Sequence, residues 1–566
     1  MPVPVVVESV HVGSSVDTAC DAQQSSCRCD EPASPLNAAD HRSDDDDFIP
    51  SDSESNTTVS SVSSVLTDDS TPSVHDDQKY IIFWSCLLSL IRLIHCPRCG
   101  EANMRQSRTL KGTMLLLVLK CTACQHKTGW NSQPYVGNIP AGNILLSSAI
   151  LTSGALVSKV LRIFSHMRVA AITARTFFRH QSQLLLPSIR HVWAEQRTWL
   201  LASLQADQRD LVLGGDGRSD SPGHSAKFGS YTVIELVANV IIDMQLVQSN
   251  EVGGAVRMEK EGLIRSLADL EGEGLTIGTI VTDRHVQIRK WLRENMPNVE
   301  HLFDVWHIAK GLKKKLLAIA NERECRELQP WIPSIINHLY WCAVSTPPGE
   351  PATVLAKWVS VLNHMVNVHT HNDALFPSCL HGRLQGREAR KQWLQPCSVT
   401  MVKLERLLTS TALLRDIRQM SGQEQTSSLE AFHSLLNQFA PKMYCFSYHG
   451  QSCRTLLAIL HFNENAGRNQ QHTEGDEARY RLQFPKWKKG GYTVRKILEE
   501  PSFDYVTEIL REVIAMCHVH VNERNMTEQE QPPPLCDGVE RPTIEDAVAA
   551  TIRRFAAHPN PRDRRT

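Results

Sequence analysis

Two pairs of cysteines with the same spacing constrain this chain more tightly than any other feature of its sequence. Cys96 and Cys99 form one CxxC pair, and Cys121 and Cys124 form a second one after 21 intervening residues. Each pair presents two thiolates from one tight turn, and two such turns close a tetrahedral zinc site. The apolar run 114–119 predicts the strand that leads to the second pair. We therefore expect a zinc ribbon whose Zn²⁺ is structural, because four protein ligands leave no open position for chemistry.

The two ends of this 566-residue chain differ from its middle, and the length itself predicts several domains. Residues 1–79 are rich in Ser and Asp and carry a net charge of −13, which predicts a disordered acidic tail. The remaining residues carry +12, which favours a polyanion such as nucleic acid, although this charge is also ordinary for so long a segment. No apolar run reaches the roughly 18 residues that span a bilayer, so we expect no membrane segment. Without a secretory signal, the cysteines are expected to be reduced.

The middle of the chain alternates strand-like and helix-like patterns in an informative order. Three strand-like runs are followed by a helix, a strand, a second helix and a last strand, an order that is typical of an RNase H-like α/β fold with a mixed sheet. The runs are 211–218, 228–237, 238–247, 257–270 (helix), 279–285, 286–295 (helix) and the residues leading to 303–307.

Two of these strands end in an aspartate, Asp216 and Asp283. The first and fourth strands are neighbours in such a sheet, so the two carboxylates should meet. Two carboxylates at one point are costly unless a cation neutralises them, and hard oxygen ligands suit Mg²⁺ or Mn²⁺. The plainer interpretation is that each acid merely ends a strand or caps a helix.

A third acid, Glu430, is expected in the first turn of a helix capped by Ser427 or Ser428, with Phe432 and Leu436 facing inward. From there its carboxylate could reach the two aspartates. Glutamate is also a common choice in a first helical turn because it complements the helix dipole.

With these residues in place, the sequence resembles the DDE-type cut-and-paste DNA transposases, and within them the Kolobok type. The blocks that carry the resemblance are 215–231 around Asp216, 281–285 around Asp283, 428–433 around Glu430 and the D-x-x-H signature formed by Asp304 and His307. The resemblance covers roughly residues 80–515.

The resemblance implies that Asp216, Asp283 and Glu430 bind catalytic Mg²⁺ or Mn²⁺. It implies that Asp304 and His307 hold these ligands in position without binding the metal, or are structural. It implies a nuclear protein that acts on double-stranded DNA, both transposon ends and target, as a homodimer or larger assembly. Transposases of this type often begin with a THAP zinc module, and no such pattern occurs here. Recognition of DNA ends would then fall to the ribbon and the helical segment, or be lost.

The expected organisation therefore has seven segments. They are an acidic tail (1–79), the zinc ribbon with a leading buried helix (80–135), a helical segment (136–208), the first part of the RNase H-like core (209–308), a Trp-rich helical insertion (309–424), the C-terminal part of the core (425–520) and a loose tail (521–566).

Several further residues have two interpretations each. Residues 156–185, with Thr173 as a cap and Arg175, Arg179 and His180 nearby, are read as a DNA-binding helix-turn-helix or as plain helical packing. Glu259 and Glu261 are read as extra carboxylates or, preferably, as a solvated helix face. A second zinc site is one reading of Cys445, His449, Cys453 and His461, and aromatic packing is the other. The lysine runs 313–315 and 486–489 suit phosphates, nuclear import or plain exposure.

Three functions remain open from the sequence alone. The first is a transposase, and the second is a transposon-derived DNA-binding or chromatin protein without catalysis. The third is an RNase H-like nuclease that cleaves without joining strands.

Overall fold

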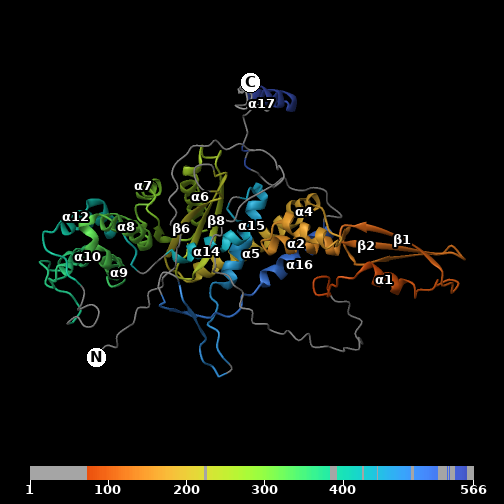
Figure 1. Cartoon of the computed structure of the whole chain (residues 1–566), viewed down its shortest axis with the longest axis horizontal. Coiled ribbons are helices and arrows are strands. Elements are labelled where there is room, and N and C mark those ends of the chain that lie inside the picture. Colours follow the sequence, from red (N-terminus) through yellow and green to blue (C-terminus); the bar gives the residue numbers. More distant parts are fainter. Residues whose placement is uncertain are drawn as a thin grey trace, which may run out of the picture. The chain divides into compact units, whose positions relative to one another are not determined.

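The structure is a computed structural model of the whole chain, and it describes residues 73–221, 226–382, 392–422, 426–442, 444–473, 475–485, 490–519, 532, 535 and 542–556. The chain divides into two compact units, residues 1–79 and 80–566, and every helix and strand below belongs to the second (Figure 1). Most of the acidic tail, the lysine run 486–489 and most of the C-terminal tail lie outside the described residues.

A three-stranded antiparallel sheet follows the first cysteine pair. Its order is β1-β2-β3, and its strands are β1 (Met104–Lys111), β2 (Met114–Cys121) and β3 (Lys127–Asn131). The strand predicted over 114–119 is confirmed. The leading helix exists as α1 (Trp84–Ile91), but the expectation that it is buried is wrong, because only Ile91 is buried there and Leu90 is 61% exposed.

The helical segment packs around one long helix. A two-stranded hairpin comes first, with β4 (Tyr135–Val136) and β5 (Ile139–Pro140). The helices are α2 (Ala141–Thr152), α3 (Val157–His166), α4 (Ala174–His180), a π-helical turn (Gln181–Leu185) and α5 (Leu186–Ala206). Thr173 caps α4 as predicted, because its side chain accepts a hydrogen bond from the backbone N–H of Thr176.

The centre of the second unit is a five-stranded mixed sheet of order β10-β9-β6-β7-β8. Strands β6, β7 and β8 are antiparallel neighbours, whereas β9 runs parallel to both β6 and β10. The elements are β6 (Leu211–Ser219), β7 (Phe228–Glu235), β8 (Val240–Gln248), α6 (Met258–Gly272), β9 (Ile277–Thr282), α7 (Val286–Asn295) and β10 (Glu300–Phe303). The predicted α/β class and the order of strands and helices are confirmed.

Apolar side chains pack the neighbouring helices against the sheet. Strand β7 is buried along its whole length, as expected for a strand that lies inside a sheet with both faces covered. Helix α6 lies against β7 and β8 (Figure 1), and its apolar side chains share a core with those of α5 and α7. This packing fixes β6 and β9 as neighbours at the centre of the sheet.

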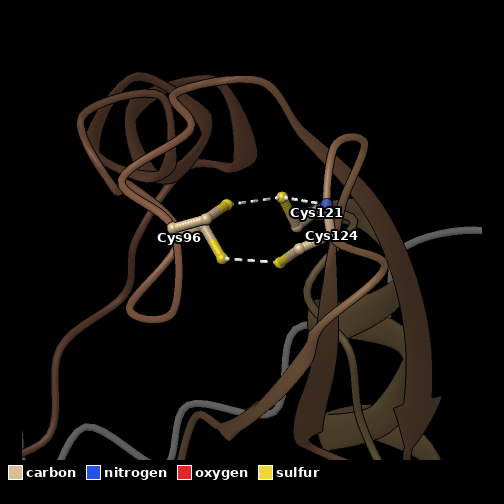
Figure 2. Close-up of side chains that lie close together, drawn as sticks. Cys96, Cys121 and Cys124 are labelled. Carbon is tan, nitrogen blue, oxygen red and sulfur yellow. Dashed lines mark hydrogen bonds between the residues drawn. The ribbon is translucent and has the colours of Figure 1, made fainter.

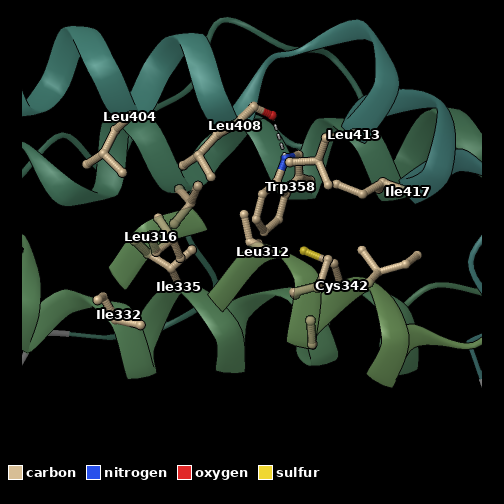
Figure 3. Close-up of a cluster of buried hydrophobic side chains, with 14 of the residues drawn as sticks. Leu312, Leu316, Ile332, Ile335, Cys342, Trp358, Leu404, Leu408, Leu413 and Ile417 are labelled. Atoms are coloured by element: carbon tan, nitrogen blue, oxygen red, sulfur yellow. Dashed lines mark hydrogen bonds between the residues drawn. The ribbon is translucent and has the colours of Figure 1, made fainter. Parts of the chain in front are cut away.

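The insertion after β10 is a separate helical layer, as predicted. Its helices are α8 (Val305–Ala320), a 3₁₀ segment (Arg323–Trp331), α9 (Ile332–Val344), α10 (Pro351–Met365), α12 (Val399–Leu408) and α13 (Thr411–Arg418). They enclose one apolar cluster (Figure 3), in which the buried Trp358 donates its indole N–H to the carbonyl oxygen of Leu408 at 3.0 Å. Trp331 is also fully buried, so tryptophans do form the centre of this layer.

The chain then returns to the sheet. The remaining elements are α14 (Ser427–Phe439), α15 (Tyr448–Asn465), β11 (Tyr480–Gln483), β12 (Thr493–Lys496), α16 (Asp504–Val519) and α17 (Ile544–Ala556). Helix α14 contacts β6, and α15 contacts α14, α5 and β8. None of the helices in the described part of the chain combines the length and apolar content that a membrane crossing requires.

Candidate active site and metal centre

The four cysteines of the two CxxC pairs gather at one end of the ribbon. Their sulfur atoms all lie within 4.8 Å of one another, and Figure 2 shows Cys96 facing Cys121 and Cys124 across the gap between the two turns. Sγ of Cys96 lies 3.6 Å from Sγ of Cys124, and Sγ of Cys99 lies 3.5 Å from Sγ of Cys121. Four thiolates around one zinc ion would be about 3.8 Å apart, given Zn–S bonds of about 2.3 Å in a tetrahedron. The cluster could hold a metal ion and is compatible with a structural zinc.

The two aspartates belong to neighbouring parallel strands: Asp216 lies in β6 and Asp283 directly follows β9. Gly214 of β6 pairs with Val281 of β9. Asp216 follows Gly214 by two residues, and Asp283 follows Val281 by two residues. Positions two residues apart point to the same face of a sheet, and neighbouring strands are about 4.8 Å apart. The prediction that the first and fourth strands are neighbours is therefore confirmed, and this arrangement places Asp216 and Asp283 at the same end of the two strands.

Each aspartate also makes a local hydrogen bond. Oδ1 of Asp216 accepts from the N–H of Gly217 at 2.8 Å, and Oδ1 of Asp283 accepts from the N–H of His285 at 2.8 Å. His285 itself caps α7 through Ile288. These bonds fix the direction of each carboxylate and leave its second oxygen for another partner.

A histidine from α14 reaches the first aspartate. Nδ1 of His433 lies 3.4 Å from Oδ2 of Asp216, and the other ring nitrogen, Nε2, is buried without a hydrogen-bond partner among the described residues. His433 follows Glu430 by three residues, so both side chains lie on one face of α14. The spacing of Glu430 and His433 is visible in the sequence, and His433 is the last residue of the segment 428–433 that carries the resemblance around Glu430.

Glu430 lies in the first turn of α14, as predicted, while Phe432 and Leu436 are buried beneath it. The predicted cap is wrong: α14 is preceded by Thr426, not by Ser427 or Ser428. The Thr426 hydroxyl donates instead to Oδ2 of Asp304, whose Oδ1 accepts from the N–H of Trp306 at 2.8 Å. Asp304 thus joins the start of α8 to the start of α14.

The side chains around Glu430 form a linked set of charges. Nδ1 of His307 lies 3.8 Å from Oδ2 of Asp304. Burial opposes ionisation of Asp304, but hydrogen bonds from Thr426 and Trp306, together with the nearby His307 ring, outweigh it and lower the pKa of Asp304. Burial raises the pKa of Glu430, and the charges of Asp304 and Asp216 add to that effect while His307 opposes it. Glu430 therefore lies within the electrostatic reach of Asp216.

A fourth carboxylate, Glu259 of α6, belongs to this site. The preferred expectation of a solvated face is wrong for Glu259, because its side chain is partly buried and covers Gly217 so closely that a Cβ there would lie 2.5 Å from its Cγ. Burial first, then the charges of Asp283 and Asp216, raise the pKa of Glu259 to about 8. Glu261 instead pairs with Arg265 at 2.9 Å.

Tyr231 of β7 packs beneath the acids. Its hydroxyl is buried without a hydrogen-bond partner among the described residues, and burial raises its pKa well above the usual value. A Cβ on Gly215 would lie 2.2 Å from this oxygen, so only glycine fits between Tyr231 and the strand.

Two cavities lie beside these acidic side chains. One of about 440 Å³ is lined by Asp216, His433, Asn437 and Lys442, among others, and another of about 200 Å³ lies against Glu259 and His285. Arg218 holds the wall between β6 and α14, since its guanidinium donates to Oδ1 of Asn437 at 2.6 Å and to the carbonyl of Ala440 at 2.7 Å.

The acids converge without closing into a single ligand shell. Among the described residues, no group containing Asp216, Asp283 and a third carboxylate has its oxygens within 4.8 Å of one another. Carboxylate oxygens are the donors that a hard cation prefers, and burial together with two acidic neighbours raises the pKa of Glu259 while no cation is present. The carboxylates would have to draw together around the ion.

The candidate helix-turn-helix separates into exposed and buried residues. Arg175 and Arg179 are exposed on α4, and α3 buries none of its side chains. His180 is buried, its Nδ1 lies 2.9 Å from the hydroxyl of Ser147, and burial lowers its pKa to about 4. His180 is therefore a neutral packing residue and not a contact for DNA.

The second zinc site that was considered around residue 450 does not form. Cys445, His449, Cys453 and His461 are absent from the groups of three or more ligands found among the described residues. Three of them lie along the continuous helix α15, where eight residues span about 12 Å. His461 packs instead against Phe503 and Tyr505.

Comparisons with known proteins leave the chain without a relative from which to transfer a function. No protein-family model matches the sequence, and no curated protein matches it.

Proposed function

We propose that this protein is a DDE-type transposase with an RNase H-like core, which hydrolyses phosphodiester bonds at transposon ends and joins the freed 3′-hydroxyls to target DNA. The observation that supports it best is the equivalent placement of Asp216 and Asp283 on neighbouring parallel strands. The strand order β10-β9-β6-β7-β8, with Asp216 inside β6 and Asp283 directly after β9, agrees with this proposal.

In the proposed mechanism, Asp216, Asp283 and Glu430 hold Mg²⁺ or Mn²⁺. The bound ion supplies a Lewis acid that activates a water or a 3′-hydroxyl and stabilises the leaving oxygen. His433 orients the carboxylate of Asp216 through its 3.4 Å contact. Asp304, supported by His307, holds the start of α14 so that Glu430 stays over the sheet.

The DNA would approach from the open side of the acidic edge. Lys442 and Arg218 lie beside the larger cavity, although Arg218 is occupied by Asn437 and Ala440. Exposed Arg175 and Arg179 add positive charge on α4, and phosphate contacts of this kind dominate affinity for duplex DNA. The proposal includes nuclear localisation and a homodimer or larger assembly, because two DNA ends must be brought together.

A second function is favoured by one specific observation. Because the carboxylates are not gathered within 4.8 Å, a DNA-binding or chromatin protein that keeps the nuclease fold as a scaffold also agrees with this geometry. Such a protein would bind duplex DNA and leave it intact. A nuclease without strand transfer differs only in the absence of a joined product.

The test is nicking of supercoiled plasmid and joining of 3′-hydroxyl oligonucleotides by the full chain in Mg²⁺ or Mn²⁺. Asp216→Asn, Asp283→Asn and Glu430→Gln should each reduce both activities by at least about a hundredfold, because each removes a charged metal ligand. Glu405→Gln, an exposed acid on α12, is the matched control and should retain activity.

Cleavage that all three variants retain would disprove the assigned site. Tight duplex binding by the wild-type chain with no cleavage in either metal would favour the scaffold instead. Cleavage without any joined product would restrict the function to a nuclease.

A further inference from the structure

A cluster of three histidines and one cysteine lies in the helical insertion, away from the acids. His364 belongs to the last turn of α10, and His369, Cys379 and His381 follow in the next segment of chain. Their ligand atoms all lie within 4.8 Å of one another. Among the described residues, this group and the four ribbon cysteines are the two sets that meet this condition.

A short hairpin brings these residues together. Asn367, with a left-handed φ of 62°, turns the chain after α10, and Thr370 then bridges Ser378 in antiparallel fashion. The N–H of Cys379 donates to the carbonyl of His369 at 3.0 Å, so these two residues face each other across the hairpin. The end of α10 and the hairpin thus supply the four ligand side chains, just as two turns supply the four cysteines of the ribbon.

The distances agree with a tetrahedral zinc shell. Nδ1 of His364 lies 3.4 Å from Nε2 of His381 and 3.6 Å from Sγ of Cys379. With Zn–N bonds of about 2.05 Å and Zn–S bonds of about 2.3 Å, the tetrahedral edges are about 3.4 Å for N···N and about 3.6 Å for N···S. The two separations in the structure agree with those edges.

The surrounding groups are arranged as supports for ligands. Nδ1 of His369 is buried without a hydrogen-bond partner among the described residues, while its Nε2 lies 3.1 Å from Oδ1 of Asn367. Ligating histidines commonly use the second ring nitrogen in this way, which fixes the ring and its tautomer. His371 does not complete the group, but its Nε2 lies 3.4 Å from Sγ of Cys379 and could donate to a thiolate.

The plainer interpretation is aromatic packing, since Trp393 contacts the rings of His364 and His369 at centroid distances of 5.7 and 5.8 Å. Packing accounts for the rings but not for a thiol and three ring nitrogens directed at one point. The segment 367–382 also buries a single large apolar side chain, Phe376, and exposes Leu375 and Leu380. A hairpin with so little core is the kind of element that a bound metal stabilises.

We propose that His364, His369, Cys379 and His381 hold a structural zinc ion that fixes the 367–382 hairpin to the end of α10. Four protein ligands close the shell, so this zinc takes no part in chemistry. The proposal is independent of catalysis at Asp216, because it concerns only the stability of the insertion.

Zinc content of the full chain, measured by mass spectrometry of the purified protein, tests the proposal. Wild type should hold two zinc ions, one here and one at the ribbon, while Cys379→Ser and His381→Ala should each hold one. Cys397→Ser, an exposed cysteine in the same insertion, is the control and should keep both. Cys121→Ser should lose the ribbon zinc alone, and its combination with Cys379→Ser should lose both.

A conservative replacement keeps the test decisive if a variant folds poorly. His381→Cys retains a zinc ligand and should keep two ions, whereas His381→Ala should not. Replacement of zinc by Co²⁺ adds a second measurement, since the thiolate absorption from this site should disappear in Cys379→Ser. The proposal is overturned if Cys379→Ser and His381→Ala both keep the wild-type zinc content, or if the only zinc in the wild type is lost with Cys121→Ser.

Discussion

The carboxylate of Glu259 has an energetic cost that depends on pH. Its pKa is raised to about 8 by burial and by the charges of Asp283 and Asp216, whereas a glutamate in an unfolded chain titrates near 4.3. Between these two values the folded chain binds more protons than the unfolded one. The stability contributed by this group is therefore present below about pH 4 and lost as the pH rises towards 8.

Glu259→Gln should remove this loss of folding stability at high pH. In buffer without Mg²⁺ or Mn²⁺, the variant should match the wild type near pH 4.5 and be more stable at pH 8.5, by on the order of 2 kcal/mol after allowance for solvent screening. Thermal unfolding at the two pH values measures the difference. Glu261→Gln is the matched control on the same helix, because its carboxylate pairs with Arg265 at 2.9 Å. Equal melting temperatures for Glu259→Gln and wild type at pH 8.5 would contradict the assignment of Glu259 to the acidic site.

Among the elements, we expect the ribbon to depend most on a bound metal ion. Its three strands bury only a small apolar cluster, formed by Ile91, Leu117 and Leu119 with a few partly buried neighbours. A sheet with so small a core is rarely stable alone, and the cysteine cluster supplies the missing free energy when zinc binds. The insertion differs, because its helices enclose a large apolar cluster around Trp358.

Cys121→Ser should therefore loosen the ribbon selectively. We expect loss of its zinc ion and at least about a tenfold increase in proteolytic cleavage within residues 96–131, because the folded state loses its metal cross-link. Limited proteolysis with mass mapping measures this change, and the central sheet should stay protected. Cys86→Ser, an exposed thiol on α1, is the control. Unchanged protection of residues 96–131 after zinc loss would show that the strands are stable by themselves.

At the scale of the whole molecule, charge distribution governs the approach to a polyanion. The residues after the acidic tail carry a net charge of +12, and exposed Arg175 and Arg179 lie on α4. Each phosphate contact releases counterions, so it steepens the dependence of affinity on salt by about 0.9 in a log–log plot.

Replacement of both arginines by alanine should lower the salt slope for duplex binding by about 2 and weaken binding uniformly across sequences. Fluorescence anisotropy between low and moderate salt measures both quantities. Arg323→Ala with Arg326→Ala removes the same charge from the exposed surface of the helical insertion and is the control. If the two double variants behave alike, α4 is a packing helix and only the overall charge attracts DNA.

Local patterns in the sequence determined much of this protein. The CxxC spacing predicted the ribbon, the strand and helix periods predicted the mixed sheet, and the strand order predicted that β6, which contains Asp216, lies beside β9, which precedes Asp283. These features depend on neighbours close in the chain and on the fixed geometry of parallel strands. The position of Glu430 in the first turn of α14 was predictable for the same reason.

Only the tertiary structure decided which side chains are buried and which distant residues meet. Glu259 became part of the acidic site because α6 packs over β6, and His180 became a core residue because α2 covers it. The Cys–His₃ cluster has no regular spacing, since its ligands come from a helix end and a hairpin. Thr426, not Ser427 or Ser428, precedes α14, and its hydroxyl donates to Asp304, 122 residues earlier, instead of capping the helix. Such contacts depend on how whole elements pack, and sequence periodicity carries no information about that.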